Sequence, residues 1–319
     1  MNTIEKNILK SLLGSLKFET MATFKFSGHE SFACRHYWVK KGVDFVADHV
    51  GTDNPFRSQD ATIKLGVGKN MVKSIEHWLK AFQLTDESTG NLTDLAQLLI
   101  LDKNGEAYDP YLESDHTPWI LHYNLMSNEV RGSIYKLIFQ KFRTSRTDPE
   151  FTANSIAAYI QRQVDLRNET HSSKSIKTDI NVFLKSYSTS SISTNKKSLE
   201  DDLSTIFNSL ELIQPLEMQV AEKVYKINFN SQQSLNSYIL LYGILDKFGS
   251  EGSIAFDDIQ SEVSNLFLCN REGTESKLRE LDVQGLLVYK QDSGRKEIQL
   301  KSDLSSSDVI SQLFEGAYV

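Results

Sequence analysis

A glycine-containing turn between two amphipathic segments constrains the fold of this chain more than any other feature. The stretch Leu65–Thr85 reads LGVGKNMVKSIEHWLKAFQLT. Gly66 provides the positive φ that a sharp exit from a helix requires. The pattern predicts a helix over about 58–65, a turn and a second helix over about 69–82. The apolar residues of that second helix recur at three- and four-residue spacing on one face, namely Val72, Ile75, Leu79 and Phe82.

A glycine-rich turn that ends in lysine is also typical of the phosphate loop of nucleotide enzymes. That loop needs G-x-x-x-x-G-K-[ST] after a buried strand. Here Gly66 and Gly68 precede Lys69, but no second glycine stands at the required spacing. Asn70 occupies the position of the magnesium-binding hydroxyl, and the preceding residues, DATIK, do not have the pattern of a buried strand. The sequence therefore favours a helix-turn-helix over a nucleotide site.

In a helix-turn-helix the start of the second helix enters the major groove of DNA. Lys69, Asn70 and Lys73 lie there, on the side opposite the apolar face. Asparagine pairs bidentately with adenine, and lysine contacts guanine or phosphate. The polar tip DESTGN between Leu84-Thr85 and Leu92-Thr93 predicts a short hairpin wing. The alternative is an ordinary packed helix pair whose lysines are solvated.

The charge of the chain is unevenly distributed. The net charge is −7, but residues 200–319 hold ten Lys and Arg against twenty Asp and Glu, which leaves residues 1–199 with 25 against 22. We therefore expect the N-terminal part to contact double-stranded DNA, because phosphate contact needs local positive potential. A second candidate surface is residues 131–147, which contain five basic side chains and no acid. A solvated helix face is the alternative for its candidate backbone-binding residues, Lys136, Lys141, Arg143 and Arg146.

Length and composition define the class of protein. A chain of 319 residues predicts about two domains. No apolar run approaches the roughly 20 residues of a membrane span, and the N-terminus does not have the pattern of a signal peptide. Cys34 and Cys269 form neither a disulfide framework nor a zinc spacing. We expect a cytoplasmic protein with reduced thiols and no membrane contact.

The pattern of apolar residues and turns predicts a mainly α fold with short β-hairpin wings, arranged as two winged-helix-like units around a helical middle region. The hairpin of the second unit is VYKQDSGRKEIQL, with an Asp-Ser-Gly turn. Before it, helix 272–284 mixes basic and acidic residues, which favours a protein-interaction or homodimer surface over a DNA reader. The predicted segments are an extension (1–21), an N-terminal winged-helix-like DNA-binding domain (22–118), a middle region that ends in a Ser/Thr-rich loop (119–198) and a C-terminal winged-helix-like domain (199–319).

Two further groups of residues are candidates for catalysis. In FSGHESF, His29 and Glu30 suit a general base or a metal site, although a capping box that starts a helix near His29 is the stronger interpretation. In DPYLESDH, Asp109, Glu113 and Asp115 suit a Mg²⁺ or Mn²⁺ ion for phosphodiester cleavage. An acidic loop with a proline turn is the alternative there, because no PD-(D/E)xK pattern is present.

Aromatic and basic residues are interleaved directly after the first of these groups. Arg35 is followed by Tyr37 and Trp38 and then by Lys40 and Lys41. Such side chains stack on bases or hold phosphates. The alternative is that the aromatic residues belong to the core and the lysines are solvated.

Several of these motifs together resemble a bacterial family of unknown-function domains that is encoded beside DNA phosphorothioation genes. The resemblance continues in KTDINVFLKSY and LREL…QGLLVY and covers nearly the whole chain from Met21 onward. It rests on FSGHESF with Arg35 and Trp38, LGVGKNMVKSI with Trp78, and DPYLE with Trp119 and His122.

The resemblance implies a metal-dependent endonuclease that binds DNA and nicks one strand, so that sulfur can enter the backbone during antiphage defence. The implied partners are a cysteine desulfurase, a sulfur-transferring adenylylating enzyme and an ATPase. The alternative is a non-catalytic DNA-binding adaptor that recruits the sulfur-transfer enzymes. The resemblance assigns no catalytic residues.

Overall fold

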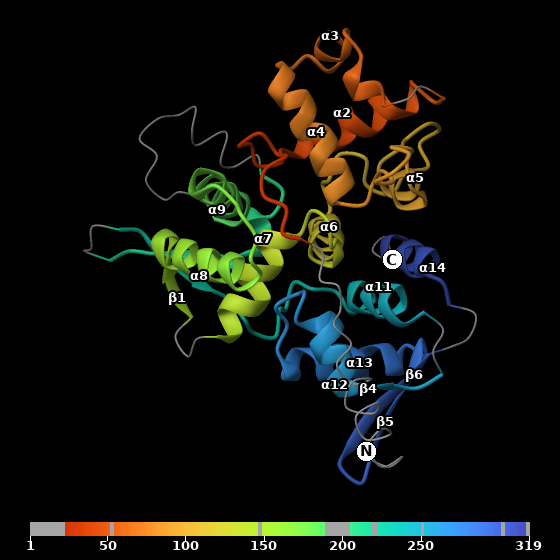
Figure 1. Cartoon of the computed structure of the whole chain (residues 1–319). Coiled ribbons are helices and arrows are strands. Elements are labelled where there is room, and N and C mark those ends of the chain that lie inside the picture. Colours follow the sequence, from red (N-terminus) through yellow and green to blue (C-terminus); the bar gives the residue numbers. More distant parts are fainter. Residues whose placement is uncertain are drawn as a thin grey trace, which may run out of the picture.

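The computed structural model of the chain describes residues 23–51, 54–145, 149–188, 205–218, 222–249, 252–300 and 304–316. In this part of the chain helices dominate, and small antiparallel sheets accompany them (Figure 1). The mainly α class with short β-hairpins that the sequence predicts is therefore confirmed. The predicted extension 1–21 and most of the serine- and threonine-rich stretch lie outside the described residues.

The N-terminal part packs its helices around two buried tryptophans, Trp38 and Trp78. Gly66 has a φ of 64° and ends one helix, and the apolar face predicted for the next helix is buried. The predicted helix, turn and second helix are thus confirmed. The elements are α2 (His36–Ala47), η1 (Pro55–Arg57), α3 (Ala61–Leu65), α4 (Lys69–Ala81) and α5 (Asp94–Leu99).

Two local predictions for this part need correction. No helix begins near His29, because α2 starts at His36 and the preceding loop has positive φ angles that interrupt any helix: 73° at Ser27, 47° at Glu30 and 66° at Ser31. The capping-box interpretation is therefore wrong. The predicted wing after α4 is reduced to one antiparallel bridge between Thr85 and Leu92.

The middle region is organised around α6, in which every residue from Thr117 to Met126 is buried. Figure 1 shows α6 between the N-terminal helices and the C-terminal elements. Within it, His122 accepts a hydrogen bond from the Tyr187 hydroxyl (2.7 Å) and donates one to the carbonyl of Leu266 (2.9 Å). The elements are α6 (His116–Ser127), α7 (Ser133–Lys136), the π-helical η2 (Leu137–Phe142), α8 (Ala153–Leu166) and α9 (Ser173–Tyr187).

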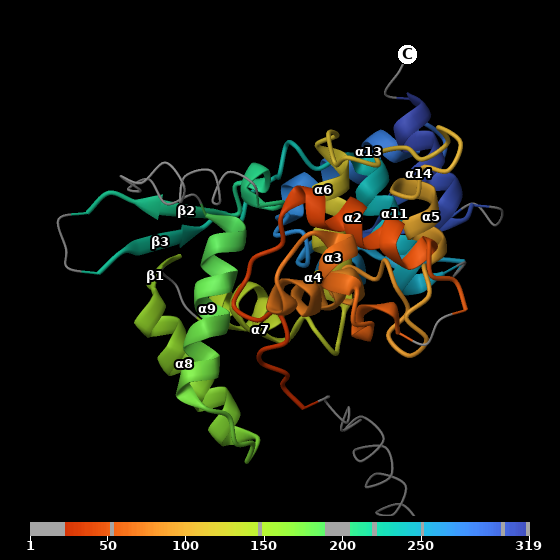
Figure 2. The same cartoon turned by 90° about the horizontal axis from the view of Figure 1, so that it is seen from above.

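A three-stranded sheet closes one end of the α8–α9 pair (Figure 2). Its order is β1-β3-β2, all antiparallel, with Phe151 and Pro215 both opposite Tyr225. Of its strands, apolar alternation in the sequence indicates only the central one, as a strand near residues 223–229. Because β1 belongs to the middle region, this sheet joins two segments that the sequence assigns to different domains. The strands are β1 (Glu150–Thr152), β2 (Ile213–Leu216) and β3 (Val224–Ile227).

The C-terminal part combines helices with a second three-stranded sheet, ordered β4-β6-β5. Ser293 and Gly294, with φ of 48° and 83°, form the two-residue turn of the predicted hairpin, which is confirmed. The elements are η3 (Asn208–Leu210), α11 (Ser237–Phe248), β4 (Ile254–Ala255), α12 (Phe256–Ile259), the π-helical η4 (Gln260–Ser264), α13 (Arg271–Val283), β5 (Leu287–Asp292), β6 (Arg295–Leu300) and α14 (Ser306–Glu315).

Candidate nucleic-acid interface

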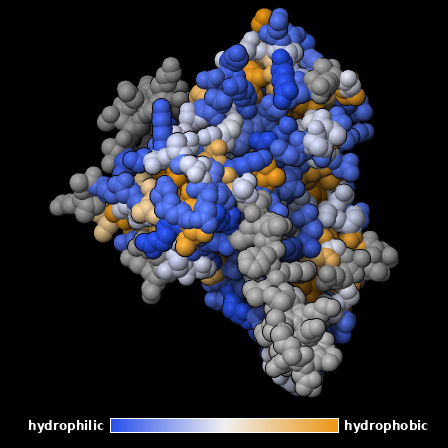
Figure 3. Space-filling view, viewed as in Figure 1, coloured by the Kyte–Doolittle hydropathy of each residue, from blue (hydrophilic) through white to orange (hydrophobic). Residues whose placement is uncertain are grey.

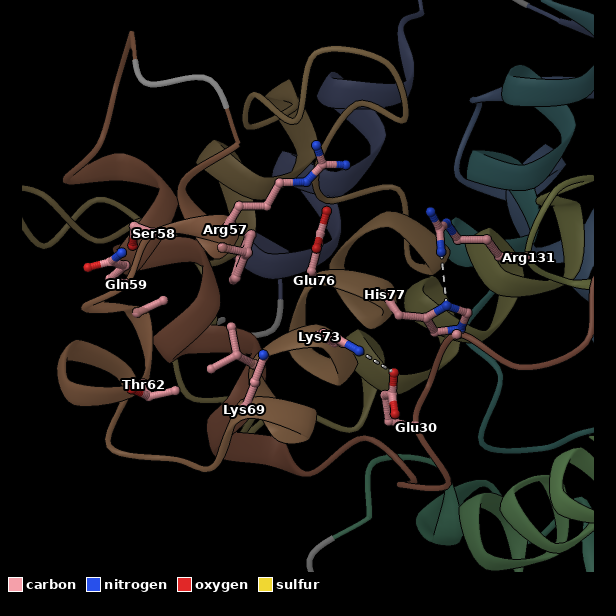
Figure 4. A pocket seen from close by; sticks show the side chains of 14 residues that line it. Glu30, Arg57, Ser58, Gln59, Thr62, Lys69, Lys73, Glu76, His77 and Arg131 are labelled. Atoms are coloured by element: carbon pink, nitrogen blue, oxygen red, sulfur yellow. Dashed lines mark hydrogen bonds and ion pairs between the residues drawn. The ribbon is translucent and has the colours of Figure 1, made fainter.

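A cavity of about 780 Å³ lies along one face of α4 (Figure 4). Its walls come from the loop at Gly28 and Glu30, from the segment that begins at η1, from α4 itself and from Arg131. The cavity thus brings together two groups that the sequence suggests separately, the FSGHESF loop and the start of the second helix. Its ionisable side chains are Glu30, Arg57, Lys69, Lys73, Glu76, His77 and Arg131.

The first turn of α4 is open to an anion. The residue before it, Gly68, offers no side chain to the backbone N–H groups, and nothing lies within 4 Å of the place where its Cβ would be. Lys69 and Asn70 are exposed there, and Lys69 has no ion pair with any described residue. Uncapped N–H groups and the positive end of the helix dipole favour phosphate oxygens.

The other charges of the cavity are partly neutralised by one another. Lys73 forms an ion pair with Glu30, with 3.0 Å between Nζ and Oε1. Glu76 accepts hydrogen bonds from Lys80 (3.2 Å) and from the side chain of Asn54 (2.9 Å). Four cationic side chains and two carboxylates line the cavity, so that its walls carry two net positive charges when His77 is neutral.

His77 is held neutral and in one tautomer. Nη1 of Arg131 donates to its Nδ1 at 2.9 Å, so the ring proton lies on Nε2. Arg131 is itself fixed by Glu87, which receives hydrogen bonds of 2.7 Å from Nε and from Nη2. Burial lowers the pKa of His77 well below its usual value, and the charge of Arg131 lowers it further.

Asp179 of α9 fixes the loop before α2. Its two carboxylate oxygens accept from the backbone N–H of Ser27, each at 3.0 Å, and Oδ1 lies 3.3 Å from Nε2 of His29. Nδ1 of His29 accepts from the N–H of Ser31 at 3.2 Å. The structure thus places His29 in the protein interior, where Nδ1 accepts a hydrogen bond and Nε2 faces Asp179 without making one, while Glu30 alone of this predicted pair lines the cavity.

Arg35 lies against aromatic rings, as the interleaved sequence suggests. Its Nη1 donates to the Tyr37 hydroxyl at 3.1 Å, and its Cζ is 5.5 Å from the centre of the Trp38 ring. Trp38 is buried, whereas Tyr37 is exposed. Only the tyrosine ring is therefore accessible to a base.

The basic segment after Arg131 is less accessible than the sequence suggests. Lys136 is partly buried and donates to the carbonyl of Ser127 at 3.3 Å. Arg143 donates to the carbonyl of Phe139 at 3.0 Å and stacks 3.9 Å above the Phe229 ring. Lys141 is exposed, and Arg146 lies outside the described residues.

The acidic loop before α6 has a structural role that its sequence does not reveal. The buried carboxylate of Asp109 accepts from the backbone N–H groups of Glu113 (2.7 Å) and Ser114 (3.2 Å) and from the Thr117 hydroxyl. Glu113 and Asp115 are exposed. The oxygens of Asp109 are thus occupied, and no three His, Cys, Asp or Glu side chains among the described residues are grouped as a metal site. This loop does not fit a divalent metal in the arrangement seen.

Among the lining residues that sequence reasoning did not single out, three are cationic or carry an imidazole. Arg57 stands alone in NPFRSQD, and His77 occurs within the buried face of α4. Arg131 belongs to the recognised basic segment, but its contact with His77 spans 54 positions. Only the folded chain could show that contact, because no local spacing encodes it.

The surface around these elements is mainly polar. Figure 3 shows that hydrophilic residues dominate the face seen in Figure 1, with hydrophobic residues in small separate areas. Among the described helices, none combines the length and the apolar composition of a membrane span.

Comparisons with known proteins agree with the fold. The sequence model of the family described as "Protein of unknown function (DUF4007)" matches residues 26–316. A crystal structure of SspB bound to a magnesium ion superposes with a TM-score of 0.77, and another SspB crystal structure with 0.75. Both are 24% identical in sequence, and the match covers 91% of this chain and 88% of the other. No curated protein sequence matches this chain. The resemblance expected from the sequence is confirmed for family and fold.

Proposed function

This chain belongs to the DUF4007 family, and from that membership and the cationic cavity we propose that it is a DNA-binding protein of an Ssp-type phosphorothioation system that nicks one strand of duplex DNA. The observation that carries the proposal is the uncapped first turn of α4 with exposed Lys69 and Asn70 at the mouth of the cavity. The fold shared with SspB and the sequence resemblance support the same system.

Binding would begin at the first turn of α4. Phosphate oxygens accept from its free N–H groups, while Lys69 contacts the backbone and Asn70 can reach a base edge. Lys73 contributes a further contact when its ammonium group leaves Glu30 and pairs with a phosphate instead. Side chains of this pair are 54% and 32% exposed, and an exposed ion pair contributes only about 0–1 kcal/mol, so the exchange is inexpensive.

The C-terminal part supports the winged-helix interpretation by its order of elements. Helix α11 is followed by β4, α12, α13 and then the hairpin β5–β6, and β4 pairs with β6. The N-terminal part follows the same plan with a much shorter wing. There Glu87, near the tip of the turn, is bound to Arg131 and does not extend outward.

Strand cleavage is the finer part of the proposal, and an adaptor is its rival. In the arrangement seen, Asp109 is used to hold its own loop, which favours an adaptor that recruits the cysteine desulfurase, the adenylylating enzyme and the ATPase. A nickase would require the acidic loop to rearrange so that the exposed Glu113 and Asp115 hold a divalent ion, and His29 and Glu30 are the other candidates.

Incubation with supercoiled plasmid and Mg²⁺ or Mn²⁺ separates the two functions. Nicked circles that disappear with EDTA, and with Glu113→Gln plus Asp115→Asn, would support the nickase. Both residues are exposed, so these changes should not affect folding, whereas Asp109→Ala would disrupt the loop. Binding without nicked circles would support the adaptor. Absence of any binding at low salt would overturn both.

The groove contacts are tested by salt dependence. In Lys69→Ala plus Lys73→Ala, the slope of log K against log salt should fall by roughly two, because each phosphate contact contributes about 0.9. Lys247→Ala is the control, since Lys247 of α11 forms a similarly exposed ion pair with Glu262 of η4. An unchanged slope in the double variant would contradict the assignment.

A further inference from the structure

The cavity deepens along one stripe of α4. Lys69, Lys73 and His77 follow one another at four-residue spacing, which advances about 6 Å per step along a helix. Exposure falls along the stripe: Lys69 is exposed, the Lys73 side chain is 54% exposed and His77 is 7% exposed. Figure 4 shows Lys73 between the other two along α4.

The deep end holds a hydrogen-bond donor that no described residue satisfies. Arg131 donates to Nδ1 of His77, which leaves the proton on Nε2. Nε2 has no partner among the described residues, although His77 is more than nine-tenths buried and lines the cavity. Nε2 is not among the fully buried polar atoms that lack a partner in the described part of the chain, so it is reachable from the cavity, where water or a ligand oxygen can accept its proton.

Charge selects the kind of acceptor. The walls carry two net positive charges, and a phosphate monoester carries about two negative charges at pH 7. Glu30 and Glu76 also face the cavity, but Glu30 is paired with Lys73, and Glu76 accepts from Lys80 and Asn54. A dianion at the deep end can therefore take Lys73 from Glu30 and gain the donor of His77.

Shape selects a terminal group. Gly28 packs against the His77 ring, and His77 and Arg131 lie together at one end of the lining side chains (Figure 4), where the end of a chain fits better than a continuous backbone. We propose that the deep end of the cavity binds a phosphate monoester through Nε2–H of His77 and Nζ of Lys73, and that its occupant is the phosphate-bearing end of a DNA strand. Lys69 and Arg57 then hold the adjoining backbone. This deepens the proposed function, since a nick creates such an end.

The experiment compares duplexes that carry one nick, in EDTA, by fluorescence anisotropy. The nick bears a 5′-phosphate, a 3′-phosphate or only hydroxyls, and an intact duplex measures general DNA binding. We expect one phosphorylated nick to bind about tenfold more tightly than the hydroxyl nick. Inorganic phosphate and a mononucleotide serve as competitors.

Variants test the contacts in both directions. His77→Gln places an amide N–H near the position of Nε2 and should keep the preference, whereas His77→Leu should abolish it. Glu30→Gln frees Lys73 and should strengthen the preference severalfold, a gain that an unfolded variant cannot produce. Lys64→Gln, on α3 outside the cavity, should change nothing.

The outcomes are distinguishable from failure of the proposed function. Equal affinity for all nicks, with no competition by phosphate or mononucleotide, would overturn the monoester site even if the intact duplex binds. Competition by the mononucleotide without a preference among nicks would overturn the strand end as occupant and assign the site to a free nucleotide. A preference for a phosphorylated nick without measurable affinity for the intact duplex would overturn general duplex binding but leave the phosphate site intact.

Discussion

Helix α4 is followed by the single Thr85–Leu92 bridge and helix α13 by the β5–β6 hairpin, and the first turns of the two helices also differ. The turn of α4 follows Gly68, which has no capping side chain, and exposes Lys69. The turn of α13 follows Asn270, whose side chain accepts from the N–H of Gly273 at 2.8 Å, and exposes Glu272. One helix therefore begins with unsatisfied donors and a Lys69 that pairs with no described residue, the other with a satisfied cap, an Arg271 that is paired with Asp257, and Glu272.

The basic residues of α13 are also committed to the fold. Lys277 is buried and donates to the carbonyls of Ser231 (3.0 Å) and Gln232 (2.9 Å). Arg279 is paired with Glu275 at 2.6 Å. Lys277 thus does not belong to the mixed-charge surface that the sequence suggests for helix 272–284. The comparison teaches that two helix starts in one chain differ in whether their first-turn donors and cations are left free for a ligand.

The largest expected effect is on DNA affinity. Lys69→Glu plus Lys73→Glu should weaken duplex binding roughly a hundredfold at low salt, since a hydrogen bond to a charged group contributes about 1.5–3 kcal/mol. The matched change, Arg271→Glu plus Arg279→Glu, alters two similarly exposed residues of α13 and should change affinity less than about threefold. Fluorescence anisotropy measures both. Equal losses would abolish the distinction between the two helices.

Acidification should lower the free energy of unfolding through His122, which links α6 to the C-terminal part by its hydrogen bond to Leu266. Burial lowers the pKa of His122 to about 4, so between pH 6.5 and 4 the unfolded chain binds a proton that the folded chain does not. Stability is therefore full above pH 6.5 and falls as pH decreases. This residue should reduce the free energy of unfolding by about 2 kcal/mol between pH 7.5 and pH 5.

Urea titrations at the two pH values check this, with His122→Gln as the variant that removes the titrating group. Its pH dependence should be smaller by that amount. The pKa of His77 is also lowered, so His77→Gln serves as a control that measures how much His77 contributes to the pH dependence of stability. An identical pH dependence in wild type and His122→Gln would contradict the assignment.

A smaller effect concerns the cap of α13. Asn270→Ala should lower the free energy of unfolding by about 1 kcal/mol, because the N–H of Gly273 loses its acceptor. Asn270→Ser retains a capping oxygen and should cost much less. Thermal unfolding followed by circular dichroism checks the pair. A loss of DNA affinity in Asn270→Ala at a temperature where it is folded would show that α13 also faces DNA.

The smallest effect is expected at the start of α4. Gly68→Ser adds the capping hydroxyl that α4 lacks, in a backbone conformation (φ −68°, ψ 159°) that serine adopts freely. Stability should rise by a few tenths of a kcal/mol, while duplex affinity should fall about threefold because the hydroxyl occupies a helix N–H. Calorimetry and anisotropy measure the two changes. A rise in affinity would show that these N–H groups do not contact phosphate.

Local patterns predict the helix pair on either side of Gly66, the helix at 272–284 and one complete hairpin. The turn at Gly66 and the buried stripe from Val72 to Phe82 follow from spacing alone. The failures are long-range. Strand β1 has only three residues and exists because it pairs with β3, and Ser27 meets Asp179 across 152 positions. The Ser27–Glu30 capping pattern misleads because that contact holds the loop in a non-helical conformation.

The candidate site divides in the same way. The sequence identifies Lys69, Asn70 and Lys73, which one helical turn places together. Arg131 donates hydrogen bonds to both Glu87 and His77. These residues come from three separate segments, so no periodic pattern in the sequence indicates the contacts. In the acidic loop the sequence misleads. Its carboxylates have the composition of a metal site, but Asp109 accepts hydrogen bonds from the backbone of its own loop.

Gly28 has a consequence for how this protein tolerates change. Its φ is 108°, and a Cβ there would lie 2.7 Å from Nδ1 of His77. Every side chain would push the imidazole away from its guanidinium neighbour, so in a saturation library this position should be as intolerant as the cavity wall itself. Intolerance in such a library would reflect the space between a loop and a ring, without any contact to nucleic acid.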